Sequence, residues 1–321
     1  MTRMLVTGGA GFIGSNFIRF LLNDRSDTEI VVNLDKLTYA GNLENLKDIA
    51  GNPAYRFIRG DICDGELVSR ILDEFDIDTV VHFAAESHVD RSISEGLSFV
   101  TTNVTGTCSL LEAARKAGIS RFIHVSTDEV YGSIRKGSFS ETDPLNPSSP
   151  YSASKAGSDL LALSYFTTHH VPVIVTRCTN NFGPFQYPEK LIPLFTTNLI
   201  EGKKVPVYGS GMNVRDWIYV LDHCRAIACI LKKGIPGEIY NIGGGTELTN
   251  LEITRKILEQ LGKDETSIQF VGDRKGHDFR YSLSSDKLHS LGWQPRFTFD
   301  EALEHTIRWY KEQEWWWRKL K

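Results

Sequence analysis

The sequence predicts an α/β fold, in which a doubly wound parallel sheet is followed by a smaller α/β C-terminal lobe. Two observations lead to this prediction. Short runs rich in β-branched residues alternate with helical patterns through the first half of the chain. A glycine-rich turn directly follows the first run, at the place where such a sheet begins its first helix.

The expected strands share consecutive apolar positions, which is typical of strands buried on both faces of a parallel sheet. They are Met4–Thr7, Ile30–Leu34, Tyr55–Arg59, Thr79–Phe83, Phe122–Ser126 and Val173–Arg177. Between them we expect helices such as Ser15–Asn23 and Asn103–Ala117. We assign residues 1–178 to this first domain.

The pattern changes after Arg177, where turn formers and prolines interrupt the periodicity. We therefore assign residues 179–321 mainly to a second lobe. A strand-like run, Glu238–Ile242, predicts that the chain returns to the first domain around residues 218–243. The chain ends near Trp315–Trp317, and three consecutive tryptophans cannot share one helix face. We expect them to pack against the C-terminal lobe rather than on a membrane.

The 321 residues are 41% hydrophobic and 24% charged, with a formal net charge of −4. These values are ordinary for a globular protein and argue against a nucleic-acid partner, whose binding depends on neutralising phosphates. No apolar stretch reaches the roughly 18 residues that cross a bilayer. The cysteines show neither a C-x-x-C pair nor metal-ligand spacing, which predicts a reducing, cytoplasmic compartment and no metal site. They are Cys63, Cys108, Cys178, Cys224 and Cys229.

The motif T-G-G-A-G-F-I-G, from Thr7 to Gly14, directly follows the first strand. Gly8, Gly11 and Gly14 have the spacing of a dinucleotide-binding turn, in which the backbone must approach a pyrophosphate closely. The free N–H groups of the following helix would then face the phosphates. The alternative is a purely structural strand–helix turn. We favour a Rossmann-type dinucleotide domain because the motif stands between a strand and a helix.

Asp35 ends the second strand, at about the 20-residue spacing expected of a carboxylate that binds the adenosine ribose. A carboxylate there repels a 2′-phosphate, so the sequence predicts NAD rather than NADP. Asp61 ends the third strand and has two equal interpretations, a contact to the adenine or a loop-capping aspartate. Ligands bind at the carboxyl ends of parallel strands, which adds Phe83, Ala84, Ala85 and Ser87.

Tyr151 and Lys155 follow a helix start predicted by Ser149 and Pro150. Their spacing of four places both side chains on one helix face. An ammonium group beside a phenol lowers the pKa of the phenol, so we expect Tyr151 to act as a base toward a hydroxyl proton. The spacing alone is common by chance, and the dinucleotide motif is what favours function.

Asp128 and Glu129 follow the fifth strand. Adjacent carboxylates usually form a solvated pair in a loop. The functional alternative is an acid and a base beside one substrate, whose pKa values are separated by burial and mutual repulsion. Their position at the carboxyl edge of the sheet favours the second interpretation.

Taken together, these motifs resemble the dTDP-glucose 4,6-dehydratases of the extended short-chain dehydrogenase/reductase superfamily. The resemblance extends over essentially the whole chain. Its most discriminating part is T-D-E-V-Y-G, because related epimerases, decarboxylases and GDP-mannose dehydratases usually have serine at the position of Asp128. It also includes D-K-L-T-Y-A-G-N at Asp35–Asn42, F-A-A-E-S-H-V-D-R-S at Phe83–Ser92, P-E-K-L-I-P at Pro188–Pro193, R-D-W at Arg215–Trp217, Y-N-I-G-G at Tyr240–Gly244 and G-H-D at Gly276–Asp278.

The resemblance implies that dTDP-glucose is converted to dTDP-4-keto-6-deoxyglucose and water. The implied steps are oxidation at C4, elimination across C5 and C6, and hydride return to C6, with NAD unchanged overall. Tyr151 would take the proton of the 4-hydroxyl while Thr127 holds the sugar, with Lys155 beside them. Glu129 would remove the C5 proton, and Asp128 would protonate the departing 6-hydroxyl.

The expected NAD site consists of Gly8, Gly11, Phe12, Ile13, Gly14, Asp35, Lys36, Leu37, Thr38, Asp61, Ile62, Phe83, Ala84, Ala85, Ser87, Thr102, Tyr151, Lys155 and Asn181. For the nucleotide sugar, the resemblance implies Ser87, Thr127, Asn180, Lys190, Leu191, Pro206, Val207, Tyr208, Arg215, Asn250, Arg274 and His277. Arginine suits a pyrophosphate because guanidinium is a bidentate donor, although an arginine is more often a surface ion-pair residue. The chain departs from the family pattern at Phe182, Lys275 and Phe279.

Because most of these motifs are shared across the superfamily, the alternative is a 4,6-dehydratase or 4-epimerase acting on a UDP-, GDP- or CDP-linked sugar. A third hypothesis is a non-catalytic NAD-binding scaffold, against which the intact set of candidate catalytic residues argues. The resemblance also implies a homodimer in which helices near Thr102–Ala117 and Tyr151–Thr168 pair across the interface.

Overall fold

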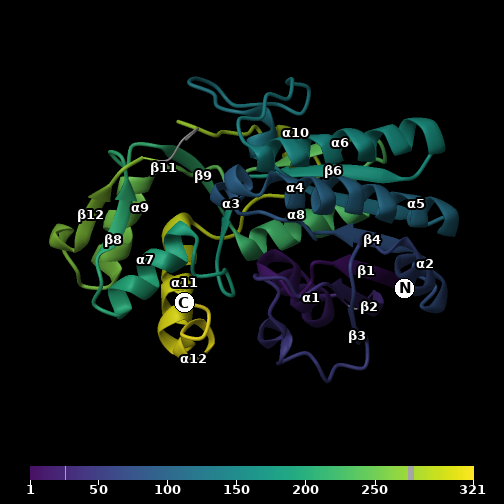
Figure 1. Cartoon of the computed structure of the whole chain (residues 1–321), viewed down its shortest axis with the longest axis horizontal. Helices are drawn as coiled ribbons and strands as arrows, with labels where there is room; N and C mark the ends of the chain where they lie inside the picture. The colour runs from purple at the N-terminus through teal and green to yellow at the C-terminus, as the bar shows by residue number, and fades with distance from the viewer. Residues whose placement is uncertain (26, 274–277) are drawn as a thin grey trace.

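The computed structural model describes residues 1–25, 27–273 and 278–321. Among these residues, seven strands form a central sheet in the order β10-β6-β5-β4-β1-β2-β3, and every neighbouring pair is parallel (Figure 1). The strands are β1 (Thr2–Thr7), β2 (Thr28–Asp35), β3 (Tyr55–Arg59), β4 (Thr79–His82), β5 (Arg121–Thr127), β6 (Val173–Cys178) and β10 (Ile239–Ile242). The doubly wound parallel sheet predicted from the sequence is confirmed.

Helices cover both faces of this sheet, so the domain has two apolar cores. On one face lie α1 (Phe12–Asp24) and α8 (Val220–Lys233), and on the other lie α2 (Gly65–Glu74), α5 (Thr107–Ala117) and α6 (Pro150–His169). Successive side chains of a strand point to opposite faces. Val6 of β1 therefore joins the first core and Leu5 the second. Burial on both faces explains the consecutive apolar residues of the strands.

The smaller lobe, on the left in Figure 1, is built mostly from residues after β6. Its described strands and α-helices are a sheet of β11 (Glu247–Thr249), β9 (Val214–Tyr219) and β7 (Asn180–Phe182), a pair of β12 (Ile268–Val271) and β8 (Val205–Tyr208), and the helices α7 (Leu191–Ile200), α9 (Asn250–Gln260), α11 (Phe299–Glu312) and α12 (Glu314–Trp317). The short helix α10 (Asp286–Ser290) packs against the central sheet at β10. Between these elements the chain enters the central sheet as β10, beside β6. The division into residues 1–178 and 179–321 stays a prediction.

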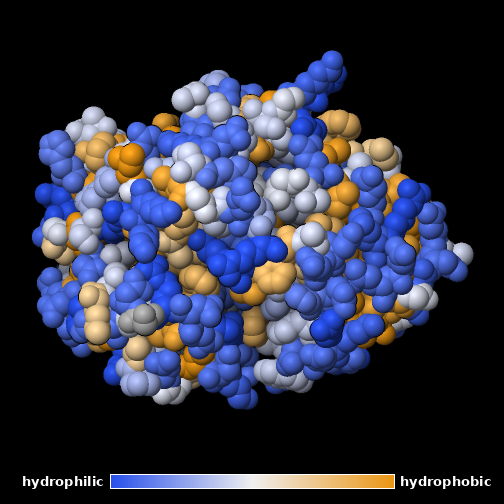
Figure 2. Space-filling view, turned by 180° about the vertical axis from the view of Figure 1, so that it is seen from behind, coloured by the Kyte–Doolittle hydropathy of each residue, from blue (hydrophilic) through white to orange (hydrophobic). Residues whose placement is uncertain are grey.

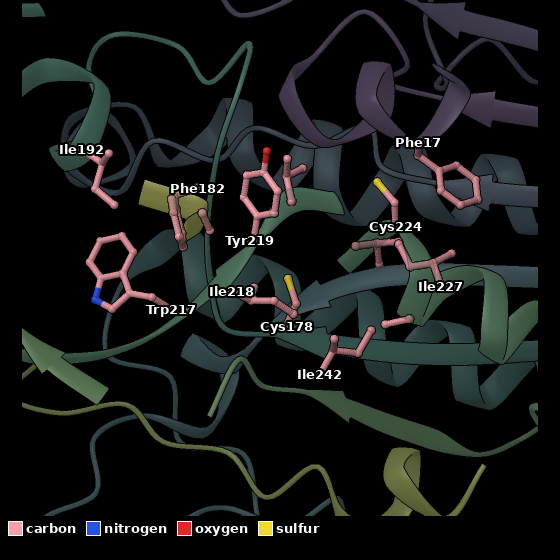
Figure 3. Close-up of a cluster of buried hydrophobic side chains, with 14 of the residues drawn as sticks. Phe17, Cys178, Phe182, Ile192, Trp217, Ile218, Tyr219, Cys224, Ile227 and Ile242 are labelled. Atoms are coloured by element: carbon pink, nitrogen blue, oxygen red, sulfur yellow. The ribbon is translucent and has the colours of Figure 1, made fainter. Parts of the chain in front are cut away.

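One apolar core runs from the sheet into this lobe without interruption. Phe17 of α1 and Ile227 of α8 belong to the same buried cluster as Phe182 of β7 and Trp217 of β9 (Figure 3). Because burial of each large apolar side chain contributes about 1.5–3 kcal/mol, this shared packing holds the lobe firmly on the sheet.

The segment before α5 differs from the sequence prediction. The sequence predicts a helix from Asn103, whereas helical structure begins at α4 (Gly96–Phe99) and continues through a π-helical segment, η2 (Val100–Gly106), into α5. Within η2, the buried Asn103 side chain bonds both backbone groups of Glu86, at 2.8 and 3.0 Å, and the hydroxyl of Ser154, at 2.8 Å. The widened turn therefore contains the side chain that ties the loop after β4 to α6.

The terminal tryptophans pack as the sequence predicts, with one addition. Trp315 is 45% exposed, whereas Trp316 and Trp317 are buried. The Trp317 indole N–H donates to the carbonyl of Tyr310 at 2.7 Å, within the lobe. The Trp316 indole N–H donates instead to the side chain of Asn45 at 2.8 Å, in the 3-10 turn η1 (Leu43–Leu46) of the first domain. The sequence gives no sign of this second contact.

None of the helices within the described ranges is long and apolar enough to cross a bilayer. The face shown in Figure 2 is largely hydrophilic, with hydrophobic side chains in small scattered groups. Exposed large apolar residues include Ile93 on α3 (Val89–Ser94), Leu97 on α4, Val100 on η2 and Leu160 on α6.

Candidate active site

A cleft of about 690 Å³ opens at the carboxyl edge of the central sheet. Its walls are formed by residues at the ends of β1 to β6, which is where open parallel sheets bind ligands. Of the predicted NAD residues, it is lined by Gly8, Gly11, Phe12, Ile13, Gly14, Asp35, Lys36, Thr38, Asp61, Ile62, Phe83, Ala84, Ala85, Ser87, Thr102, Tyr151, Lys155 and Asn181. Leu37 is not a lining residue.

The glycine turn fits a dinucleotide because it has no room for side chains. Gly8 has a φ of +70°, and a Cβ added there would lie 2.6 Å from the backbone nitrogen of Ala84. A Cβ on Gly14 would lie 2.4 Å from the carbonyl oxygen of Gly8. The helix α1 begins after Gly11 with no side-chain cap, so no side chain occupies the N–H groups of its first turn. These groups lie at the cleft, where phosphate oxygens can accept hydrogen bonds from them.

Asp35 ends β2, as predicted, and is buried. Its carboxylate accepts hydrogen bonds from the backbone N–H of Ala10 at 2.9 Å and of Leu37 at 2.8 Å. Burial raises the pKa of Asp35, and these two bonds oppose that rise. Besides lining the cleft, Asp35 therefore joins the glycine turn to the loop after β2.

Asp61 shows the second of its two predicted interpretations. Its Oδ1 accepts the backbone N–H of Cys63 at 3.0 Å, which caps the loop after β3. Its Oδ2 forms an ion pair with Lys36 Nζ at 2.6 Å. Asp61 also lines the cleft, so this one residue both caps the loop after β3 and forms part of the cleft wall.

Helix α6 begins with Ser149 as its N-cap and Pro150 in its first turn, as the sequence predicts. Tyr151 and Lys155 both line the cleft. The expected lowering of the Tyr151 pKa by Lys155 is wrong. Burial raises the pKa of Tyr151 well above its ordinary value, and the nearby Glu129 adds to the rise. Lys155 instead donates to the carbonyl of Val125 at 2.8 Å.

The nearby hydroxyl of Thr127 lowers the pKa of Tyr151, against the larger effect of burial. Burial likewise lowers the pKa of Lys155. The sequence shows that the two residues share a helix face, but it does not show how far water is excluded. Desolvation disfavours every charged form, and it is the largest effect on the pKa of both Tyr151 and Lys155.

Asp128 and Glu129 begin the 3-10 turn η3 (Asp128–Tyr131), directly after β5. Thr127 Oγ1 accepts the backbone N–H of Glu129 at 3.3 Å and donates to Asp128 Oδ1 at 3.2 Å. Asp128 is 3% exposed, and its pKa is raised well above the ordinary value by burial and then by repulsion from Glu129. Asp128 therefore retains a proton under conditions in which ordinary carboxyl groups have lost theirs.

A segment of the second lobe, residues 183–190, crosses the cleft. At one end, Asn16 of α1 donates to the carbonyl of Pro184 at 3.0 Å. At the other end, Glu189 accepts a hydrogen bond from Tyr39 at 3.1 Å and lies 3.4 Å from His88 Nε2. The cleft is also lined by residues that were not predicted from the sequence, namely Tyr39, Gln186, Tyr187 and Glu189. Two of them, Tyr39 and Glu189, lie in the D-K-L-T-Y-A-G-N and P-E-K-L-I-P motifs.

The residues predicted to bind the nucleotide sugar are only partly gathered at this cleft. Ser87, Thr127, Asn180 and Lys190 line it. The others lie in the second lobe, where Leu191 begins α7, Pro206, Val207 and Tyr208 belong to β8, Arg215 to β9, and Asn250 begins α9. Arg274 and His277, together with the departing residue Lys275, lie outside the described residues.

Arg215 is buried, and its guanidinium donates to the carbonyl of Asp278 at 2.9 Å and lies 4.4 Å from the centre of the Tyr281 ring. Its positive charge lowers the pKa of Asp128 against the effect of burial, so it lies close enough to η3 to act on that carboxyl group. Phe182 is buried against Phe299, with ring centres 5.1 Å apart, while Phe279 is exposed. Within the described ranges, no group of three or more His, Cys, Asp or Glu residues is arranged to hold a metal ion.

Residues 5–306 match the family model described as GDP-mannose 4,6 dehydratase. The chain is 55% identical to a dTDP-glucose 4,6-dehydratase of Streptomyces niveus, a match that covers 99% of this chain and 96% of that protein. It is also 55% identical to the low-salt glycan biosynthesis protein Agl12 of Haloferax volcanii, over 96% of this chain and 98% of that one.

Solved structures are similar over the same length. The dTDP-glucose 4,6-dehydratase DesIV of Streptomyces venezuelae, with NAD and dTDP bound, has a TM-score of 0.97 at 54% identity, and the match covers both chains fully. A UDP-glucose 4-epimerase of Thermus thermophilus, in complex with NAD, has a TM-score of 0.89 at 33% identity, covering 97% of this chain and 99% of that one.

Gly14→Ala is expected to weaken NAD binding by about tenfold or more, because its Cβ forces open the turn that receives the pyrophosphate. The added atom would lie 2.4 Å from the oxygen of Gly8 and 2.8 Å from the Cα of Gly9. Titration calorimetry with NAD measures the change. The matched control is Gly51→Ala, whose Cβ meets no atom within 4 Å. Equal affinities in the two variants would contradict the role given to the turn.

Asp128→Asn is expected to change how stability depends on pH. A carboxyl with a raised pKa binds more protons folded than unfolded, so its contribution is complete at low pH and is lost as pH rises through the folded pKa. Above about pH 4, the unfolding free energy of the wild type should fall relative to that of Asp128→Asn, by about 1.4 kcal/mol per pH unit within that window.

Denaturant unfolding over a pH series measures this difference. The control is Asp143→Asn, because hydrogen bonds from Ser140 lower the pKa of the half-buried Asp143. In that comparison the wild type should gain stability over the variant as pH rises. Parallel curves for the wild type and Asp128→Asn would show that Asp128 is ionised in the folded protein.

Proposed function

The chain belongs to the dTDP-glucose 4,6-dehydratases, and from this premise we propose that its cleft converts dTDP-glucose to dTDP-4-keto-6-deoxyglucose and water with Thr127, Asp128, Glu129, Tyr151 and Lys155 as the reacting machinery. The observation that carries this assignment is the burial of Asp128 directly beside Glu129 in the wall of the cleft, which raises the pKa of Asp128. An elimination needs an acid at the leaving hydroxyl and a base at the neighbouring carbon, and these two adjacent carboxyl groups supply both.

Tyr151 and Thr127 carry out the first proton transfer. Both side chains line the cleft and lie near one another, so a 4-hydroxyl placed between them is held by Thr127 and gives its proton toward Tyr151. When bound, NAD would supply the hydride acceptor at C4 and the hydride donor at C6. The cleft residues around the glycine turn and Asp35 would hold it, with Tyr151 and Lys155 in the same cleft.

The elimination is carried out by the two carboxyl groups of η3, Asp128 and Glu129. Once C4 is a ketone, the C5 proton is acidic and Glu129 removes it. Asp128 gives its proton to the 6-hydroxyl, which leaves as water, so the C5–H and C6–O bonds break and a C5–C6 double bond forms. The return of a hydride to C6 and of a proton to C5 completes the 4-keto-6-deoxy product. The two carboxyl groups can divide these tasks because only Asp128 is both buried and adjacent to a second carboxylate.

The remaining lobe residues support a nucleotide site. Lys190 at the cleft and Arg215 behind η3 bring positive charge to the side of the cleft facing the second lobe, where a diphosphate requires it. We assign the sugar to the space between Tyr151 and Glu129 and the nucleotide to the lobe beyond Asn180. The cysteines of the chain are all free, which supports a place in the reducing cytoplasm, and fractionation of source cells tests it.

The chemistry is tested by following a deuterium placed at C4 of dTDP-glucose. The label is expected at C6 of the product, because the hydride removed from C4 is returned to the same sugar. C5 is expected to acquire hydrogen from solvent, because Glu129 exchanges its proton with water. NMR of the product decides the outcome.

Label retained at C4 would indicate an epimerase, and label lost to free reduced cofactor a simple dehydrogenase. UDP-, GDP- and CDP-glucose serve as matched substrates in the same assay. Turnover of one of these in preference to dTDP-glucose would replace the nucleotide assignment and leave the chemistry intact.

We propose that the chain forms a homodimer through η2 and α6. Val100 on η2 and Leu160 on α6 are 47% and 60% exposed, which leaves large apolar side chains in water on neighbouring helices. Leu160→Lys is expected to halve the mass measured by sedimentation equilibrium. Ile235→Lys is the control, because Ile235 is also 60% exposed but follows α8. A wild-type chain that sediments as a monomer would contradict the proposal.

A further inference from the structure

Arg177 is a buried cation of β6 with no place in the reaction described above. It is 2% exposed, although arginine is rarely buried without a partner. Its Nε donates to Asp159 Oδ2 at 2.9 Å, and its Nη1 donates to the hydroxyl of Tyr131 at 2.7 Å. The guanidinium carbon also lies 4.7 Å from the centre of the Tyr131 ring. Arg177 therefore joins two side chains that come from different elements.

The direction of each hydrogen bond in this group is fixed. Arginine only donates, so the Tyr131 oxygen must accept from Arg177 and give its own hydrogen elsewhere. That hydrogen goes to Asn241 Oδ1, at 2.9 Å. Asn241 lies beside Arg177 in the register of β6 and β10, and its amide nitrogen donates to the carbonyl of Phe139 at 3.1 Å. Tyr131 is thus held between two partners that both belong to the sheet.

Arg177 connects two parts of the proposed catalytic site, the helix α6 through Asp159 and the turn η3 through Tyr131. Asp159 belongs to α6, one turn after Lys155 and two turns after Tyr151. Tyr131 is the last residue of η3, the turn that begins with Asp128 and Glu129. We propose that Arg177 and Tyr131 are positioning residues that hold the carboxyl groups of η3 in register with the tyrosine of α6.

Helix α6 has other anchors, whereas the hydroxyl of Tyr131, at the end of η3, is held only by this group among the hydrogen bonds of the described residues. The capping box of Ser149 and Ser152 fixes the start of α6, and Lys155 bonds the carbonyl of Val125. The start of η3 is fixed by Thr127. At its end, the bond from Asn146 to the carbonyl of Val130 restrains the backbone, and the Tyr131 hydroxyl restrains the side chain. Loss of that hydroxyl therefore acts on η3 and leaves α6 in place.

This placement matters because one bound sugar must meet both halves of the site. Its 4-oxygen must reach Tyr151 while C5 and the 6-oxygen reach Glu129 and Asp128. A displacement of about 1 Å in a catalytic group costs up to roughly a hundredfold in rate. A shift of η3 alone should slow the elimination and spare the oxidation at C4. The inference rests on the proposed function, because it uses these two steps.

The test is Tyr131→Phe, which keeps the ring over Arg177 and removes only the hydroxyl. In single-turnover experiments with dTDP-glucose, we expect oxidation at C4, followed by the absorbance of reduced nicotinamide, within about twofold of wild type. We expect loss of water to slow by about tenfold or more, so that the reduced cofactor accumulates before product forms.

The matched control is Tyr240→Phe. Tyr240 is a buried tyrosine of β10, next to Asn241, and its hydroxyl accepts the backbone N–H of Ile235 at 3.1 Å. The control loses a buried hydrogen bond on the same strand without touching η3. Both steps should keep their wild-type rates in Tyr240→Phe, and the melting temperatures of the two variants should be similar.

Equal slowing of both steps in Tyr131→Phe, or the same accumulation in Tyr240→Phe, would overturn the positioning role. Should Tyr131→Phe not fold, Asn241→Ser is measured in the same way, because it weakens the acceptor of the Tyr131 hydrogen and keeps the arginine contact. The wild-type measurement distinguishes failure of this inference from failure of the proposed function. Turnover of dTDP-glucose by wild type with unchanged step rates in both variants refutes the inference alone, whereas no turnover by wild type refutes the proposed function.

Discussion

The parallel register of β5, β6 and β10 is the constraint on which the catalytic edge depends. It sets Thr127 beside Cys178, and Arg177 beside both Ser126 and Asn241. Because parallel strands end at one edge, the residues that leave β5 enter the cleft next to the helix that precedes β6. The turn η3, which contains Asp128 and Glu129, and the helix α6, which contains Tyr151, are therefore neighbours at this edge of the sheet, although about twenty residues of chain separate them.

Exclusion of water gives these groups their different characters. Asp128 and Glu129 are chemically similar and adjacent, but burial and repulsion raise the pKa of Asp128. The same exclusion raises the pKa of Tyr151, which favours the neutral phenol. Burial therefore favours the protonated forms of Asp128 and Tyr151 beside the less buried Glu129.

Much of this arrangement is predictable from local sequence patterns. The apolar runs predict the strands, T-G-G-A-G-F-I-G predicts the turn after β1, and Ser149 with Pro150 predicts the start of α6. Features that depend on distant residues are not predictable in this way. Glu189 meets Tyr39 across 150 positions of sequence, and Trp316 meets Asn45 across 271. The predicted lowering of the Tyr151 pKa is wrong for the same reason. Spacing on a helix carries no information about how much of the fold surrounds the phenol.

Strand β10 has a consequence for how such enzymes can be recombined. The chain leaves the central sheet after β6, builds part of the second lobe, and returns as β10 before the rest of that lobe forms. The strand that completes the sheet also supplies Asn241 to the group around Arg177. A graft that exchanges everything after β6 would therefore carry a foreign edge strand into the cofactor domain. Chimaeras designed to alter sugar or nucleotide preference need two insertions, one on each side of residues 239–242, with the native strand kept between them.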